Sequence, residues 1–152
     1  MKKVLVLGGG KVGKSVAELF LCCGKGEYAV TLADRERSNL AEAETNIARL
    51  RGLVKHKVEF ATRVVDAGDQ SSVREALRGH DYVVCMLPFD LVAGIADIAN
   101  ELGVHYFDVT EDVETTERVK AIAAGGRAKI ALASFMPSTK ARIGGAWIPA
   151  RS

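Results

Sequence analysis

The segment from Gly8 to Gly13 (GGGKVG) follows directly on the apolar run Val4–Leu7, and Asp34 ends the next apolar run. A strand, a glycine turn, a helix start, a second strand and then an acid about 20 residues on make up the dinucleotide-binding fingerprint. A glycine-rich motif alone is a weak signal, but here the strand, the helix and the acid stand in the required order. The pattern therefore predicts a βαβ unit that binds a dinucleotide.

The three glycines of the motif answer different steric demands. Gly8 suits the tight turn off the first strand, and Gly10 leaves the main chain open to the cofactor's pyrophosphate. Gly13 allows the following helix to pack closely against the sheet. Lys11 and Val12 begin that helix, whose first N–H groups and positive dipole end favour an anion. We expect all five residues to contribute to cofactor binding.

The polar residues that follow the second and third apolar runs are expected to contact the adenosine half of the dinucleotide. Asp34 is expected to accept hydrogen bonds from the adenosine ribose, which favours NAD because its carboxylate would repel a 2′-phosphate. Arg35 leaves NADP open, since its guanidinium is able to stack on adenine or pair with a 2′-phosphate. Asp66 is expected near the adenine amino group. The alternatives to cofactor binding are that Arg35 is a solvated residue at a helix start and that Asp66 is an ordinary turn aspartate.

Residues after the fourth and fifth apolar runs are expected at the nicotinamide end. Leu87, Pro88 and Phe89 form a stiff turn that we place beside the nicotinamide ribose. Asp108 and Thr110 follow the fifth run at the rim nearest the reaction centre. A purely structural turn and a helix cap are the respective alternatives.

The same glycine segment also satisfies the spacing of a phosphate-binding P-loop. Gly8 and Gly13 are five positions apart, and Lys14 and Ser15 follow. Such a protein also needs an acid after a buried strand to hold magnesium. The third glycine and the acid that ends the second strand favour the dinucleotide interpretation over this one.

Apolar runs alternate with amphipathic stretches through most of the chain, which predicts a doubly wound parallel α/β sheet with helices on both faces and the order 3-2-1-4-5-6. The expected strands are Val4–Leu7, Tyr28–Ala33, Val58–Val65, Asp81–Leu87, Tyr106–Val109 and Ile130–Ala133. The expected helices are Val12–Cys23, Ser38–Arg51, a short one capped by Asp69 or Ser71, Leu91–Leu102 capped by Asp90, and Glu114–Ala124 capped by Thr110 or Asp112.

Residues 1–137 are predicted to form this domain, and residues 138–152 break the pattern. The last 15 residues show neither a strand period nor a helix period, so we expect an irregular tail. With 152 residues the chain is long enough for one domain with a proper core.

Composition excludes several classes of partner and site. The net charge of +2 has no basic stripe, so we expect no nucleic acid. No run approaches the ~18 apolar residues of a membrane span, and the apolar stretch near the start is too short for a signal peptide. The three cysteines and three histidines show no ligand spacing, so we expect no metal. We expect a cytoplasmic location, and a homo-oligomer stays open.

Five segments together resemble the amino-terminal cofactor domain of the saccharopine dehydrogenase-like family. They are Val4–Gly13, Ala33–Arg35, Val65–Asp69, Asp81–Val84 with Leu87–Phe89, and Gly103–Asp108, and the likeness spans roughly residues 1–137. The resemblance implies an NAD(P)-dependent oxidoreductase that acts on a C–N bond of an amino acid or amine. Residues 138–152 do not match the segment that leads to the family's substrate domain, so catalysis by this chain alone is not expected.

Two classes of function follow from these observations. One is the cofactor domain of a dehydrogenase, competent in binding and deficient in turnover. The other is a regulatory domain that senses NAD or a nucleotide and performs no chemistry. The Pro88–Phe89 turn and the Gly103–Asp108 segment favour the first.

Overall fold

The computed structural model describes residues 1–109, 112–126, 128–132, 140–143 and 146–149, which alternate strand and helix along the chain. The strands are β1 (Lys2–Leu7), β2 (Tyr28–Asp34), β3 (Glu59–Val64), β4 (Tyr82–Cys85), β5 (His105–Asp108), β6 (Ile130–Leu132), β7 (Lys140–Ile143) and β8 (Ala146–Pro149). The helices are α1 (Lys11–Cys23), α2 (Arg37–Arg51), α3 (Gln70–Leu77), α4 (Phe89–Leu102) and α5 (Val113–Ala124).

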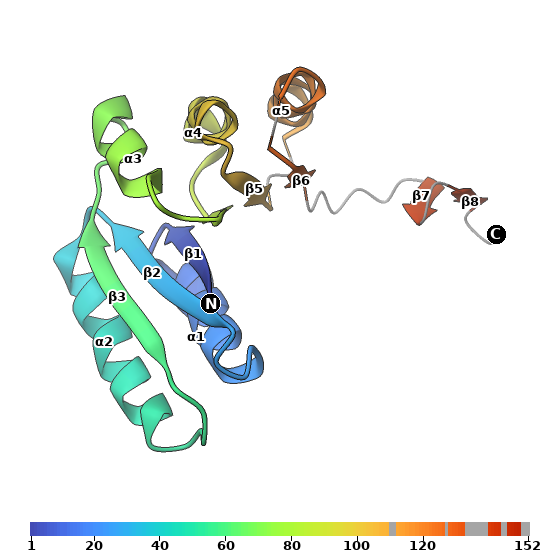
Figure 1. The fold of residues 1–152 in the computed structure, drawn as a ribbon. Helices are drawn as coiled ribbons and strands as arrows, with labels where there is room; N and C mark the ends of the chain where they lie inside the picture. Colours follow the sequence, from blue (N-terminus) through green and yellow to red (C-terminus); the bar gives the residue numbers. More distant parts are fainter. Residues whose placement is uncertain (110–111, 127, 133–139, 144–145, 150–152) are drawn as a thin grey trace.

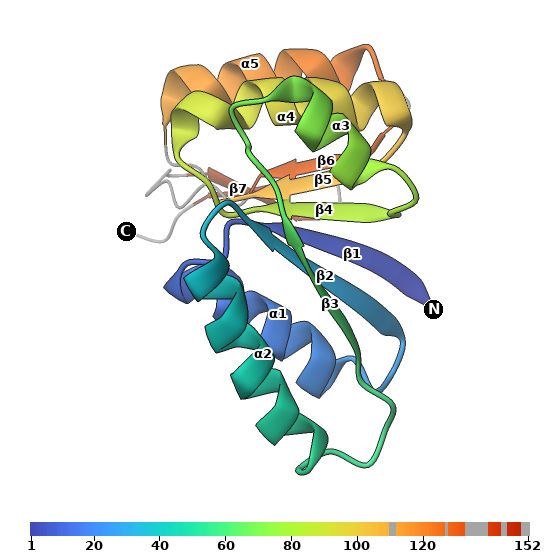
Figure 2. The same cartoon turned by 90° about the vertical axis from the view of Figure 1, so that its left-hand side faces the viewer.

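The first six strands form one parallel sheet in the order β3-β2-β1-β4-β5-β6 (Figure 1). Helices α1 and α2 cover one face, and α3, α4 and α5 cover the other (Figure 2). The predicted doubly wound fold and strand order are confirmed. Parallel neighbours need crossovers, and right-handed crossovers place the two sets of helices on opposite faces. Strand β1 lies in the middle, with Val4–Leu7 buried.

Helix α1 is turned differently from what its apolar spacing suggests. Gly13, Ala17 and Leu21 are buried, whereas Val12 and Leu19 are 60% and 61% exposed. Two of these three inward residues are the smallest types, at a spacing of four, so α1 lies close to the sheet. The larger apolar side chains are displaced toward the flanks of the helix as a result.

Two predicted caps are confirmed and two are wrong. Asp69 and Asp112 cap α3 and α5, and their carboxylates accept the N–H groups of Ser71 and Thr115. Helix α2 begins one residue before Ser38, so Ser38 does not cap it. Helix α4 begins directly after Pro88, which places Asp90 in its first turn rather than at the cap. The fixed φ of proline suits a residue at a helix start.

The expectation of an irregular segment over residues 138–152 is wrong for two stretches. Strands β7 and β8 pair with each other as an antiparallel two-stranded sheet, separate from the main sheet. Two glycines separate them in the sequence, which is the residue type that short hairpin turns favour. The strands are only four residues long, too short for a period to stand out in the sequence.

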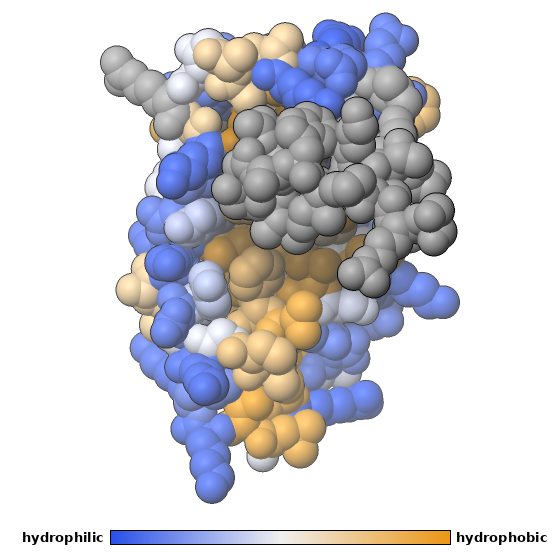
Figure 3. Space-filling view, turned by 90° about the vertical axis from the view of Figure 1, so that its right-hand side faces the viewer, coloured by the Kyte–Doolittle hydropathy of each residue, from blue (hydrophilic) through white to orange (hydrophobic). Residues whose placement is uncertain are grey.

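One part of the sheet surface is apolar and accessible to solvent (Figure 3). Tyr82, Val84 and Phe107 of β4 and β5 line an open hollow of about 380 Å³ together with Phe20 and Tyr28. Phe107 is 36% exposed, and its ring centroid lies 6.2 Å from that of Tyr82. None of the residues that the sequence assigned to a cofactor lines this hollow.

His80 is a half-buried histidine just before β4. Its Nε2 lies 3.2 Å from the hydroxyl oxygen of Thr31 on β2. Burial lowers the pKa of His80, and the charges of Lys3 and Arg63 lower it further. The Ala76 backbone and the carboxylate of Asp81 act in the opposite direction, but the net shift of the pKa is downward. The fold therefore favours the neutral ring.

This shift makes the stability of the domain pH-dependent. Because the pKa of His80 is lower in the folded chain, its contribution is present above the ordinary histidine pKa of about 6.5 and is lost as the pH falls below it. We expect His80→Gln to flatten this part of the profile of unfolding free energy, measured by urea titration between about pH 8 and pH 5. Parallel losses of stability in both proteins would contradict the assignment.

Candidate functional site

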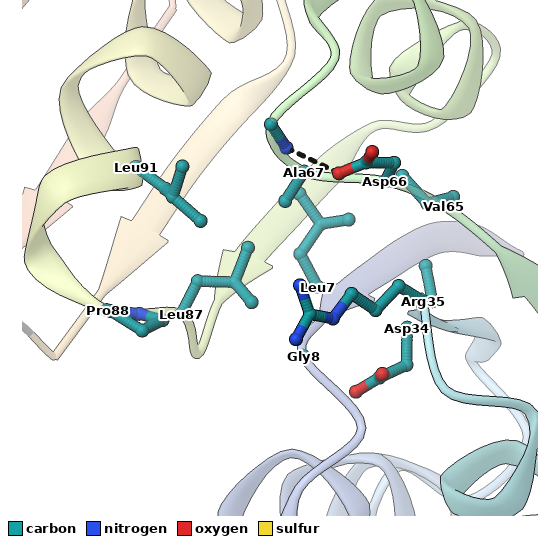
Figure 4. A pocket seen from close by; sticks show the side chains of 12 residues that line it. Leu7, Gly8, Asp34, Arg35, Val65, Asp66, Ala67, Leu87, Pro88 and Leu91 are labelled. Carbon is teal, nitrogen blue, oxygen red and sulfur yellow. Dashed lines mark hydrogen bonds between the residues drawn. The ribbon is translucent and has the colours of Figure 1, made fainter.

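A cavity of about 390 Å³ opens at the carboxyl ends of β1, β2, β3 and β4 (Figure 4). Ligands of open parallel sheets bind at this edge, where the strand order reverses. The residues that line the cavity are Leu7, Gly8, Ala33, Asp34, Arg35, Val65, Asp66, Ala67, Gly68, Leu87, Pro88 and Leu91.

The glycine turn between β1 and α1 borders the cavity through Gly8. Gly8 has a φ of +101°, and a Cβ there would lie 2.8 Å from the carbonyl oxygen of Met86. A Cβ on Gly13 would lie 1.7 Å from the carbonyl oxygen of Gly8, so only glycine allows α1 to approach the turn this closely. Gly10 precedes α1, and a Cβ there would meet no atom within 4 Å. Two glycines therefore serve the fold, and Gly10 borders open space.

Asp34 joins the end of β2 to this turn. The N–H of Gly9 donates to its Oδ2 at 2.5 Å, and the N–H of Glu36 donates to its Oδ1 at 2.7 Å. The side-chain amide of Asn39 lies 3.3 Å from Oδ2. A Cβ on Gly9 would lie 3.1 Å from the Asp34 side chain, so this position is also crowded. The carboxylate is thereby held at the edge of the cavity.

Arg35 and Asp66 border the cavity from neighbouring strand ends. The Arg35 guanidinium extends over the cavity toward Gly8 in Figure 4, and its side chain is 77% exposed. Its Nε lies 3.3 Å from a carboxylate oxygen of Glu36. The N–H of Gly68 donates to Asp66 Oδ1 at 2.9 Å, which closes a tight turn after β3. A cation and an anion thus face the same end of the cavity.

The junction of β4 and α4 forms the opposite wall. Leu87, Pro88 and Leu91 present apolar surface to the cavity (Figure 4). Phe89 is the first residue of α4, and it is 60% exposed and does not line the cavity. Asp108 is 2% exposed and is not among the residues that line the cavity.

The structure brings together about half of the residues that the sequence assigned to the cofactor. Gly8, Asp34, Arg35, Asp66, Leu87 and Pro88 line the cavity; Gly10, Lys11, Val12, Gly13, Phe89 and Asp108 do not; Thr110 lies outside the described residues. Lys11 and Val12 are exposed in the first turn of α1, next to Gly10.

The sequence did not predict several residues that line the cavity. It also did not predict Gly9 and Asn39, which contact the Asp34 carboxylate. Leu7, Ala33 and Val65 are buried strand ends, and their lining role follows from the same rule that selected Asp34 and Asp66. Leu91 carries no such signal because its position depends on how α4 leaves the sheet. The contacts of Gly9 and Asn39 with Asp34 likewise depend on the turn geometry.

The P-loop alternative does not fit the geometry. Lys14 is 9% exposed in α1, and its ammonium group forms an ion pair with Glu42 of α2. The Ser15 hydroxyl donates to the carbonyl oxygen of Lys11 at 3.1 Å within the helix. A P-loop needs these two groups at the phosphates and the magnesium ion. Here both are engaged within the helical layer.

A glycine turn that opens onto a helix start, a fixed acid after β2 and a cavity at the switch point of the sheet define a Rossmann-type domain that binds a nicotinamide dinucleotide. Residues 4–133 match the family described as saccharopine dehydrogenase NADP binding domain. The chain belongs to this family, as its resemblance in five segments implied.

Solved structures of dehydrogenases share the fold at low sequence identity. Saccharopine dehydrogenase (L-Glu forming) from Saccharomyces cerevisiae matches 87% of this chain with 18% identity and a TM-score of 0.65, and the match covers 26% of that chain. Lactate dehydrogenase from Eimeria maxima, solved with NADH and oxamate, matches 86% with 13% identity and a TM-score of 0.65, covering 43% of that chain. Shikimate dehydrogenase from Mycobacterium tuberculosis matches 87% with 17% identity and a TM-score of 0.60, covering 46%.

Two further observations concern the described part of the chain. No group of three or more His, Cys, Asp or Glu side chains there is arranged to hold a metal ion. Within the same ranges, none of the helices combines the length and the apolar character needed to cross a membrane.

Gly10 and Gly13 provide a matched pair of substitutions. Gly10→Val places a branched side chain in open space at the helix start, so we expect a folded protein that has lost dinucleotide binding. Gly13→Ala places a methyl group against the Gly8 carbonyl, so we expect a loss of thermal stability first. Titration calorimetry and thermal denaturation of the three proteins separate the two effects. Equal affinity of Gly10→Val and wild type for NAD(H) would contradict the placement of the pyrophosphate.

Proposed function

We propose that this chain is the cofactor half of a saccharopine dehydrogenase-like oxidoreductase and that it holds NAD(H) across the carboxyl ends of β1, β2, β3 and β4. The observation that carries the proposal is the Asp34 carboxylate, held by the Gly9 N–H at 2.5 Å beside an open cavity. It combines the acid and the glycine turn of the fingerprint in one contact.

Each part of the cofactor has a complementary part of the cavity. The adenosine ribose fits at Asp34, and the pyrophosphate fits between Gly8 and Gly10 at the start of α1. The adenine fits beneath the Arg35 guanidinium, with Asp66 beyond it. The nicotinamide ribose fits against the wall that contains Leu87, Pro88 and Leu91.

The choice of NAD over NADP rests on the charge next to the adenosine ribose. Asp34 accepts three hydrogen bonds inside the protein, and a carboxylate has about four acceptor positions, which leaves room for a ribose hydroxyl. A 2′-phosphate would meet the same carboxylate and be repelled. Arg35 is the exposed cation that would favour NADP, the cofactor in the family's description.

The reaction that we propose is hydride transfer between the nicotinamide and the carbon of a C–N bond in an amino acid or amine. Its support is the family, together with the saccharopine dehydrogenase among the structural matches. The chain spans 26% of that yeast enzyme. Hydride transfer needs a substrate held against the nicotinamide, and we assign that task to polypeptide other than these residues.

A cytoplasmic location completes the proposal. Cys22, Cys23 and Cys85 are free thiols, as in proteins of reducing compartments.

Substitution of Asp34 tests the cofactor preference. Asp34→Ser removes the charge and lets Arg35 pair with a 2′-phosphate, so the ratio of NADP to NAD affinity should rise at least about tenfold, because a hydrogen bond to a charged group contributes roughly 1.5–3 kcal/mol. Asp34→Asn keeps the shape of the side chain and should shift the ratio in the same direction. Asp66→Asn serves as the matched control at the adenine end. A wild-type preference for NADP would show that Arg35 dominates.

Turnover by the isolated chain tests its role as a cofactor half. Orientation of the reacting groups lowers the barrier by ~7–11 kcal/mol in a complete enzyme. We therefore expect no detectable oxidation of saccharopine or lysine by the 152 residues when NAD(P) is bound, measured by the absorbance of the reduced nicotinamide. Robust turnover would show that these residues form a self-sufficient active site.

A further inference from the structure

A cluster of polar side chains is buried where β4 and β5 end. Cys85, Tyr106 and Asp108 are 1%, 0% and 2% exposed, respectively. Cys85 and Asp108 are register partners on the two neighbouring strands. Tyr106 and Cys85 belong to the apolar core beneath α3, α4 and α5. The thiol, the hydroxyl and the carboxyl group of these residues are buried together in an apolar core. Burial of polar groups is unfavourable for folding unless they form hydrogen bonds.

The Tyr106 hydroxyl is the centre of this cluster. It lies 3.5 Å from the carbonyl oxygen of Val92 in α4, and the side chains of Asp108 and Cys85 are near enough to raise its pKa. The N–H of Leu87 contacts the Cys85 sulfur. Burial raises the pKa of Tyr106 above its ordinary range and the pKa of Cys85 to about 11, so both groups keep their protons at neutral pH. The hydroxyl therefore acts as a donor between β5 and α4.

These contacts lie directly behind one wall of the cavity. Val92 follows Leu91, a wall residue, and the N–H group that contacts Cys85 belongs to Leu87, another wall residue. Pro88 lies between them and precedes α4. The cluster thus braces the β4–α4 junction against the end of β5. Core packing alone does not require the hydroxyl, since phenylalanine has nearly the same volume.

We infer that Tyr106 is a positioning residue for the nicotinamide half of the cofactor, acting through the β4–α4 wall and the end of β5. This inference rests on the proposed function. The Tyr106 hydroxyl holds the first turn of α4 at a set distance from β5, so the wall that receives the nicotinamide ribose keeps its shape. The adenosine half is assigned to Asp34 and the glycine turn, at the ends of β2 and β1, whereas the cluster lies at the ends of β4 and β5.

The test compares a whole cofactor with its adenosine half. NADH contacts the wall, whereas ADP without magnesium carries only the adenosine and the two phosphates. In the full chain, Tyr106→Phe should weaken NADH binding about fivefold and leave ADP binding unchanged, as loss of one hydrogen bond predicts. Fluorescence of the reduced nicotinamide and calorimetry measure the two affinities. Tyr82→Phe is the matched control, because its ring lines the apolar hollow on the sheet surface.

The possible results distinguish failure of the positioning role of Tyr106 from failure of the proposed function. Unchanged NADH affinity in Tyr106→Phe, or an equal loss for NADH and ADP, overturns the positioning role while the proposed function stands. A wild-type chain that binds neither ligand overturns both. Should Tyr106→Phe not fold, Cys85→Ala removes one contact of the hydroxyl and should show the same split with a smaller magnitude. Absence of the split in that variant also overturns the inference.

Discussion

The close approach of α1 to the glycine turn is the constraint on which the rest of the site depends. A Cβ on Gly13 would lie 1.7 Å from the Gly8 carbonyl oxygen, so the helix start and the strand end are in contact through main-chain atoms. This contact accompanies a rotation of α1 that brings Ala17 and Leu21 onto the sheet and leaves Lys11 and Val12 of the first turn exposed. Close packing of the fold thus depends on Gly8 and Gly13, whereas Gly10 leaves open space at the helix start, where an anion is favoured.

Asp34 extends this arrangement to the second strand. By accepting the Gly9 N–H, its carboxylate ties the end of β2 to the turn after β1. A residue that is expected to bind ribose therefore also holds the turn at which we expect the pyrophosphate.

Most of the fold followed from local patterns in the sequence. Alternating strands and helices imply parallel pairing, and right-handed crossovers leave few orders for six strands. The cavity residues Asp34, Arg35, Asp66 and Pro88 were found because each follows an apolar run. Leu91 was missed because it belongs to a helix, and Asp108 does not line the cavity because alternation along β5 turns its side chain into the core.

The sequence by itself determined the doubly wound sheet, the glycine turn and the edge of the sheet at which the cavity lies. These features depend on periodicity, chain connectivity and residues with unusual backbone freedom. Only the tertiary structure decided which face of α1 is buried, that Lys14 is paired with Glu42, and that Cys85, Tyr106 and Asp108 meet behind the cavity wall. Such contacts join elements far apart in the chain, and their distances are set by how closely whole helices pack on the sheet, which local spacing does not encode.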